Sequence, residues 1–192
     1  AGPQLLGGRT QAAEFKTTLK KALIGSPSEE TLRSWKEAGF DGMEARVGSY
    51  SPESGKSAQQ MAERLGMRIH STLYGWASVN QADAFGGEVE KIAAGLVSTG
   101  NLGATAMLLV PCRIGGMPMP EPWEFAIEMD EATGHITKVV EGDNAPYGEY
   151  IKAHNQATDA TRKAVEKLIP VAEKAGVVIA LENVWNNLWV KP

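Results

Sequence analysis

Helical segments that end at glycine and continue into apolar strands recur along this chain, and this repeat constrains the fold more than any other feature. Gly39, Gly66 and Gly176 each separate a predicted helix from a predicted strand, and Gly100 and Gly103 do so in a further unit. Glycine readily adopts the left-handed conformation that ends helices. Strands that alternate with helices predict right-handed crossovers and a parallel sheet. The fold class is therefore α/β, either an open doubly wound sheet or a (β/α) barrel.

Periodicity and capping signals place the individual elements. The predicted helices span residues 26–38, 57–65, 81–98 and 150–175, and the predicted strands span 19–24, 40–47, 67–73, 104–111 and 177–181. The first helix opens with Ser26, Pro27 and Glu29, which form a capping sequence with proline at the first helical position. In the last helix, apolar or tolerant side chains recur every three or four residues, which lays one helix face against the sheet. Pro170 is expected to bend this helix without ending it.

The last predicted strand runs directly into a carboxylate, Glu182. The apolar, β-branched residues of this strand indicate burial on both faces, as a parallel sheet requires. Charged and polar side chains also stand at or near other predicted strand ends, namely Glu44, Arg46, His70, Ser71, Arg113 and Asn183. Strand ends of this kind meet at the catalytic mouth of a TIM barrel, so the pattern favours a barrel over an open sheet. No Gly-x-Gly-x-x-Gly follows an early strand, so dinucleotide binding has no support.

The domain organisation is simple apart from one insertion. Residues 1–17 are predicted to form an N-terminal extension, and residues 18–192 one incomplete TIM-barrel domain. Within residues 115–146, two strand-like runs at 123–130 and 135–141 are joined through a glycine, which predicts a β-hairpin. The hairpin could cover substrate, contact a neighbouring subunit or be a surface decoration.

The composition argues against several classes of partner. The 192 residues carry a net charge of -4, which suggests no basic surface for nucleic acid. No apolar run approaches the roughly 20 residues of a membrane span. The only cysteine, Cys112, cannot form an intrachain disulfide and has no base nearby in sequence that would make it a nucleophile. Localisation stays open, because Ala1 fits a cytoplasmic protein or one exported after signal-peptide cleavage.

Three stretches together match a known pattern. They are Ala-Gly-Phe-Asp-Gly-Met-Glu at 38–44, Arg-Ile-His-Ser at 68–71, and segment 169–186, which contains Ala-Glu-Lys-Ala-Gly-Val-Val-Ile-Ala-Leu-Glu-Asn-Val-Trp-Asn. From about residue 18 onward the chain resembles the sugar phosphate isomerase/epimerase family, the xylose isomerase-like TIM barrels. A complete barrel takes about 250 residues. The resemblance therefore implies a fragment of about five βα units, completed by a missing C-terminal half or by a homo-oligomeric partner.

The resemblance also implies roles for individual residues. In the family, the carboxylate that ends the fifth strand binds a divalent metal, which makes Glu182 the predicted catalytic and metal-binding residue for Mn²⁺, Mg²⁺ or Zn²⁺. The remaining ligands belong to strands six to eight, beyond Pro192. His70 is expected to end the third strand and line the substrate pocket. The other predicted substrate-binding residues are Glu44, Trp76, Arg113, Asn183 and Trp185. Leu188 stands where the ketose epimerases carry a second glutamate, which argues against their two-carboxylate proton transfer.

The predicted function is that of a metal-dependent isomerase or epimerase that acts on a sugar, a sugar phosphate or a related hydroxy-ketone through an enediolate. Two alternatives stay open. One is a lyase or phosphodiesterase of the same superfamily, of the inosose dehydratase or endonuclease IV type. The other is a non-catalytic carbohydrate-binding domain. The acidic balance of the chain argues against the endonuclease.

Overall fold

Helices and strands alternate through residues 17–182, the part of the chain that the computed structural model describes. The main sheet contains β1 (Ala22–Gly25), β2 (Gly42–Arg46), β3 (Arg68–Trp76), β4 (Ala106–Val110) and β7 (Val178–Leu181). The helices are α1 (Glu29–Glu37), α2 (Pro52–Arg64), α3 (Phe85–Asn101) and α4 (Gly148–Ala175), with a 3-10 turn at Ala145–Tyr147. A second sheet consists of β5 (Glu128–Met129) and β6 (Ile136–Lys138). None of the helices in this range is long and apolar enough to cross a membrane.

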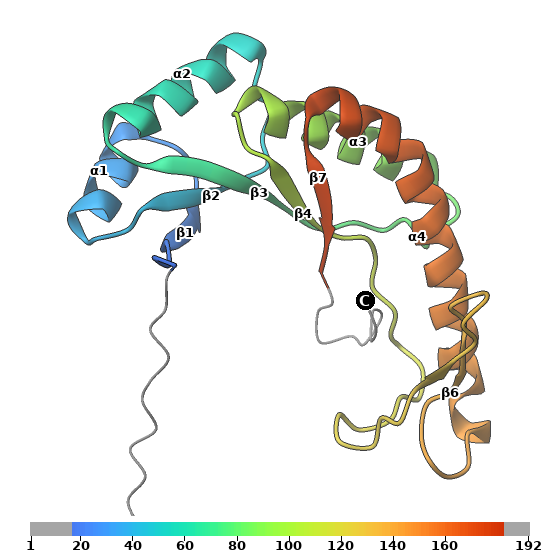
Figure 1. Cartoon of the computed structure of the whole chain (residues 1–192). Coiled ribbons are helices and arrows are strands. Elements are labelled where there is room, and N and C mark those ends of the chain that lie inside the picture. The colour runs from blue at the N-terminus through green and yellow to red at the C-terminus, as the bar shows by residue number, and fades with distance from the viewer. Residues whose placement is uncertain (1–16, 183–192) are drawn as a thin grey trace, which may run out of the picture.

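The main sheet is parallel and its helices cover one face. Its strands pair in the order β1-β2-β3-β4-β7. Figure 1 shows α1 to α4 on the convex side of the curved sheet, and within the described residues the concave side carries no helix. Consecutive strands that are neighbours, with every connecting helix on the same side, are typical of a barrel rather than a doubly wound sheet. The predicted partial TIM barrel is therefore confirmed.

Glycine ends the helices where the sequence predicted. Gly39, Gly66, Gly103 and Gly176 have φ values of 85°, 64°, 70° and 67°, in the left-handed region that glycine adopts without steric cost. Each of the four comes shortly after the end of a helix and shortly before a strand. Pro170 lies inside α4 and does not end it, as predicted.

The helix starts differ from the prediction. The N-cap of α1 is Ser28, whose hydroxyl accepts a hydrogen bond of 3.1 Å from the Thr31 N–H, and not Ser26. The helix α2 begins at Pro52, five residues before the predicted start at 57, and Ser51 caps it. A serine followed by proline marks a helix start. Ser51 and Pro52 carry this signal at α2, whereas Ser26 and Pro27 lie just before the actual cap of α1, Ser28.

Successive side chains along each strand point alternately to the helix-covered face and to the concave face of the sheet. Thr72 of β3 is buried, and its hydroxyl lies 2.6 Å from that of Thr99 in α3, so Thr72 faces the helices. Successive strand residues point to opposite faces. Ser71 therefore faces the concave side, where its hydroxyl donates to the Glu44 carboxylate at 2.9 Å. The register aligns one row across all five strands, made of Ile24, Glu44, Ser71, Ala106 and Val178. In a complete barrel, side chains on this face from alternate strands form the interior layers.

Two apolar clusters hold the helices against the convex face. In the first, Leu32 of α1 and Met43 of β2 are fully buried together with residues of α2 and β3. In the second, Ile92 of α3, Met107 of β4 and Leu168 of α4 are fully buried. Full burial of a side chain of this size contributes about 1.5–3 kcal/mol. The helix-facing side of the sheet is therefore the stabilised one.

The edge strands are much more exposed than the sequence predicted. Among the described residues, β1 and β7 each pair with a single strand. Val178 of β7 is 65% exposed and Ile24 of β1 is 49% exposed. The prediction of a last strand buried on both faces is wrong, because neither a further strand nor a layer over the concave face covers it in this range. The apolar composition of β7 is nevertheless that of a strand covered on both sides. This mismatch agrees with the predicted incomplete barrel.

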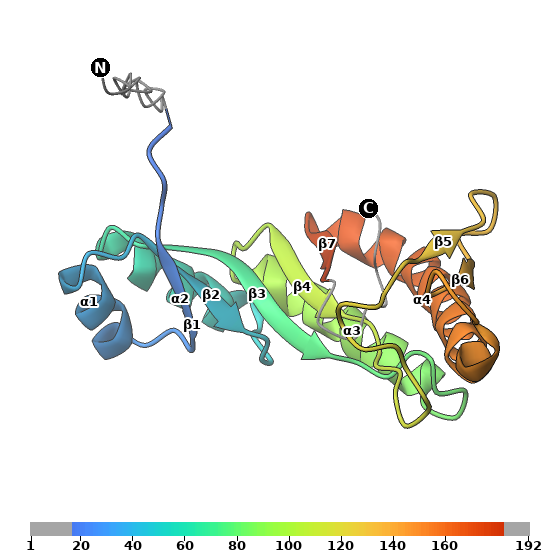
Figure 2. The same ribbon diagram turned by 90° about the horizontal axis from the view of Figure 1, so that it is seen from below.

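The predicted β-hairpin is present, with shorter strands, and it is docked on α4. Figure 2 shows β5 and β6 beside this helix. The Ile136 N–H donates to the Asn155 side chain at 2.8 Å, and the Asn155 amide donates back to the Ile136 carbonyl at 3.0 Å. The His135 ring lies 2.7 Å from the Asp159 carboxylate. The hairpin is therefore fixed to α4 by polar contacts as well as by the burial of Ile136.

The helices α3 and α4 approach each other closely at Gly100. A Cβ at this position would lie 2.7 Å from the carbonyl oxygen of Ala175, so Gly100→Ala should destabilise the protein by about 1–3 kcal/mol. Gly87 in the same helix faces open space. Gly87→Ala should be neutral or stabilising by up to about 1 kcal/mol, because alanine favours helix. Urea denaturation measures both variants, and equal effects would contradict the close contact.

Candidate active site

The carboxyl ends of β3, β4 and β7 meet at one level of the concave face. Trp76 pairs with Val110, and the Glu182 N–H donates to the Leu109 carbonyl at 3.1 Å. Ile179 packs against the helix-side core, so alternation turns Glu182, three residues later, to the concave side. We call Trp76, Val110 and Glu182 the edge row. This row lies at the carboxyl end of the strands, where TIM barrels carry their active sites.

Arg113 stacks on Trp76 at this edge. Its guanidinium carbon lies 4.6 Å from the centre of the Trp76 ring, a cation–π contact that contributes about 0.5–1 kcal/mol at exposed sites. The carbonyl of Arg113 accepts a hydrogen bond of 3.0 Å from the Asn80 side chain, which ties the segment after β4 to the segment after β3. Trp76 remains 43% exposed. The structure thus brings together two predicted substrate-binding residues and leaves aromatic surface accessible.

Glu182 can bind a cation but cannot form a metal site with the described residues alone. Its side chain is exposed at the end of β7. Mn²⁺, Mg²⁺ and Zn²⁺ take four or more ligands, with oxygen preferred by the harder ions. Within residues 17–182, no group of three or more His, Cys, Asp or Glu side chains is arranged to hold a metal ion. A metal-binding role for Glu182 stays a prediction.

Glu44 lies deeper on the concave face than the edge row. Within the described range its carboxylate accepts a hydrogen bond from Ser71 and forms no ion pair with an arginine. Arg46 comes two residues later on the same face of β2 and is exposed. Within residues 17–182, Glu44 therefore forms no salt bridge with an arginine. A substrate-binding role for Glu44 stays a prediction.

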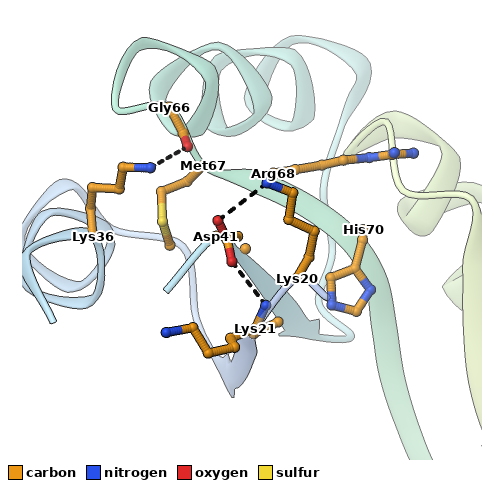
Figure 3. A pocket seen from close by; sticks show the side chains of 10 residues that line it. Lys20, Lys21, Lys36, Asp41, Gly66, Met67, Arg68 and His70 are labelled. Carbon is orange, nitrogen blue, oxygen red and sulfur yellow. Dashed lines mark hydrogen bonds and ion pairs between the residues drawn. The ribbon is translucent and has the colours of Figure 1, made fainter. Parts of the chain in front are cut away.

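His70 lies near the opposite end of the sheet from the edge row. It is the third residue of β3, and the strand continues to Trp76, about 20 Å further at about 3.3 Å per residue. Figure 3 shows the His70 ring beside a cavity of about 640 Å³ that Lys20 and Asp41 also line. The prediction that His70 ends its strand is wrong, because Ser71 to Trp76 extend the ladder along β4. His70 is therefore not brought together with the edge row.

Residues that line the cavity beside His70 connect the segment before β1 to neighbouring parts of the chain. Asp41 accepts a hydrogen bond of 3.0 Å from the Lys21 backbone N–H, and the Lys20 ammonium lies 3.6 Å from the same carboxylate. The Lys21 hydrogen bond is the main cause that lowers the pKa of Asp41. The Lys36 ammonium donates to the Gly66 carbonyl at 3.0 Å (Figure 3). The amino end of a TIM barrel stabilises the fold rather than performing chemistry, and we interpret these contacts in the same way.

Two predicted site residues, Asn183 and Trp185, lie outside the described residues, and their roles stay predictions. Arg46 stands at a predicted strand end but is not among the predicted substrate-binding residues. Arg46 stands two residues after Glu44, a spacing that puts both side chains on one strand face. Asn80 carried no such signal, because its contact with Arg113 joins loops that are distant in sequence.

Cys112 is a buried thiol. Burial raises its pKa to about 11 from 9.0. The thiolate is the reactive form, so labelling by Ellman's reagent at pH 8 should be about 100-fold slower in the folded protein than in the unfolded protein. Stability should not depend on this thiol below pH 9, where both states are protonated. It should fall as the pH rises from about 9 to 11, because only the unfolded thiol then ionises freely. Rapid labelling of the folded protein would contradict this assignment.

Comparison with known proteins supports the fold through shape rather than sequence. No family model and no curated protein matches the chain. A xylose isomerase domain protein from Planctomyces limnophilus matches with a TM-score of 0.57 and 9% identity over 88% of this chain and 55% of that one. The 3-keto-D-glucoside 4-epimerase from E. coli matches with a TM-score of 0.57 and 15% identity over 88% of this chain and 57% of that one. Mannonate dehydratase from Streptococcus suis matches with a TM-score of 0.52 and 14% identity over 88% of this chain and 56% of that one.

These matches define the class of fold. The described chain has the architecture of part of a TIM barrel, the fold that the resemblance in sequence implied. The chain spans about half the length of the solved structures it matches. At such low identity the fold alone is shared, and one fold supports many chemistries. The function therefore has to be argued from the edge row.

Proposed function

We propose that this protein contributes part of the active site of a divalent-metal-dependent isomerase or epimerase, which acts on a sugar or a related hydroxy-ketone through an enediolate. The observation that carries the proposal is the edge row, in which Glu182 and Trp76 stand on the two strands that flank β4. The similarity of the fold to an epimerase and to a xylose isomerase domain protein adds support.

Each residue at the edge has a physical role in this proposal. The exposed surface of Trp76 offers an apolar wall to the carbon face of a sugar ring. The stack with Arg113 restricts both side chains before substrate arrives, which lowers the entropy cost of binding. Glu182 provides an anionic oxygen for a divalent cation. When bound, such a cation would polarise the substrate carbonyl and so acidify the neighbouring C–H.

The remaining ligands and the base belong, in this proposal, to further βα units. The open edges at β1 and β7 leave backbone hydrogen-bonding groups and apolar side chains that additional strands would cover. These units would come from the same polypeptide or from a partner chain. The resemblance in sequence implies an aspartate, a histidine and a glutamate on them. We refer to the chain together with these units as the assembled barrel.

A lyase is the second candidate. The fold shared with mannonate dehydratase supports it. Both reactions begin when a base removes the proton next to a carbonyl. In an isomerase the proton is returned to the neighbouring carbon. In an epimerase it is returned to the opposite face of the same carbon. In a lyase the electron pair instead expels a β-hydroxyl group, which leaves as water after protonation.

Removal of the Glu182 carboxylate tests its role as a metal ligand. In the assembled barrel, Glu182→Gln should weaken Mn²⁺ binding by at least about tenfold, because even outer-shell partners of metal ligands affect affinity tenfold or more. Isothermal titration calorimetry measures the change. Glu166→Gln, at an exposed position on α4, is the matched control and should bind Mn²⁺ as the parent does. Unchanged binding by Glu182→Gln would contradict the metal assignment.

Proton NMR in D₂O separates the candidate functions. With the assembled barrel, Mn²⁺ and a panel of ketoses and sugar acids, an isomerase or epimerase incorporates deuterium at the carbon next to the carbonyl. A lyase produces a new enol or ketone signal, and one C–OH carbon loses its hydroxyl group as water while it stays in the product. Sugar binding without either change would overturn both enzyme proposals and favour a carbohydrate-binding domain.

A further inference from the structure

We infer that Gly75 is a positioning residue of the proposed site, because a β-bulge at this glycine turns Trp76 from the helix-covered face of the sheet to the concave face. The inference rests on the proposed function, since it names the feature that aims one member of the edge row. Gly75 acts through the direction of the Trp76 ring and not through a contact of its own with substrate.

The ladder between β3 and β4 skips one residue of β3, which is Tyr74. The pairs on either side of this residue are Leu73 with Leu108 and Gly75 with Leu109. The ladder continues beyond the bulge, where the Ala77 N–H donates to the Val110 carbonyl at 2.8 Å. Bulges are rare between parallel strands, and they are over-represented next to active sites, where they change the direction of a side chain. The position of this bulge, one residue before Trp76, fits such a role.

Tyr74 and Trp76 stand on opposite faces of the sheet although they are only two residues apart. The Tyr74 ring packs against the helix-side core, and a Cβ added to Gly95 of α3 would lie 3.2 Å from that ring. Trp76 pairs with Val110, which directly follows the buried, helix-facing Leu109, so Trp76 stands on the concave side. In a regular strand, residues two apart share a face. Without the bulge, Trp76 would therefore point toward the helices.

The bulge requires glycine because of backbone conformation and not because of space. Gly75 has a φ value of 85°, in a region that glycine adopts freely, asparagine tolerates and β-branched residues avoid. Within residues 17–182, no atom lies within 4 Å of a Cβ built at this position. A side chain at position 75 therefore changes the backbone preference of β3 without a clash among these residues.

The direction of the Trp76 ring decides whether it can serve the proposed site. On the concave face the ring belongs to the edge row with Glu182 and stacks with Arg113. On the other face the ring would lie under α3, where side chains of the helix-side core already pack. A regular β3 would thus offer no aromatic wall to a sugar.

The test compares glycine variants of the isotope-labelled assembled barrel by NMR. Gly75→Val should lose the nuclear Overhauser contact between the Trp76 ring and the δ protons of Arg113. It should also bind D-fructose about tenfold or more weakly, as the loss of one aromatic contact implies. Gly75→Asn should keep both properties, because asparagine tolerates a positive φ value. Gly75→Ala should show a weaker contact than Gly75→Asn, which provides a second comparison in case Gly75→Val does not fold.

Gly39→Val is the matched control. Gly39 has the same φ value of 85°, but it lies between α1 and the amino end of β2. A Cβ there would lie 3.6 Å from the Lys21 ammonium, an ordinary contact distance. Valine at position 39 therefore strains the backbone in the same way, while the Trp76–Arg113 contact and the affinity for D-fructose should stay at parental values.

Three results would overturn the inference. They are an intact Trp76–Arg113 contact in Gly75→Val, a stronger contact in Gly75→Ala than in Gly75→Asn, and equal losses in Gly75→Val and Gly39→Val, which would indicate a general loss of stability. The Overhauser contact is measured without sugar, so it decides the role of Gly75 by itself. A parent protein that binds no D-fructose would instead count against the proposed function.

Discussion

The position of Glu182 depends on the parallel pairing of β4 with β7. Ala106 pairs with Val178 and Leu109 with Leu181. A slip of one residue would turn every side chain of β7 to the opposite face, which would remove Glu182 from the concave side and Val177 from the core. Val177 is buried, and burial of one such side chain contributes about 1.5–3 kcal/mol. Apolar packing behind the sheet therefore decides where the carboxylate in front of it points.

The same sheet has one stabilised face and one open face. Behind it, the two apolar clusters and the close approach of Gly100 to Ala175 hold the helices in place. In front of it, Ile24, Val178 and Trp76 remain exposed. Side chains on the open face would form the interior of a complete barrel, with polar and charged residues gathered toward the carboxyl end. The described chain thus presents an open concave surface on a scaffold that is stabilised from the other side.

The sequence predicted the features that local chemistry determines. The order of helices and strands and the glycine ends of the helices follow from signals within a few residues, such as Gly39 and Gly176. Features that depend on distant contacts were predicted less well. The length of β3, and with it the place of His70, is set by the pairing with β4. The stack of Arg113 on Trp76 joins the ends of two strands and has no counterpart in local sequence. Exposure of Val178 depends on what covers β7, which periodicity does not reveal.

Paramagnetic broadening by Mn²⁺ tests the central claim most directly, because it reports where a divalent cation binds. The indole N–H of Trp76 and the backbone N–H of Glu182 belong to the edge row, whereas His70 and Asp41 belong to the cavity at the amino end. In the assembled barrel, we predict that substoichiometric Mn²⁺ broadens the signals of the edge row first and that Zn²⁺ in excess restores them. Broadening centred on His70 and Asp41, or no selective broadening at all, would contradict a metal-centred active site at the edge row.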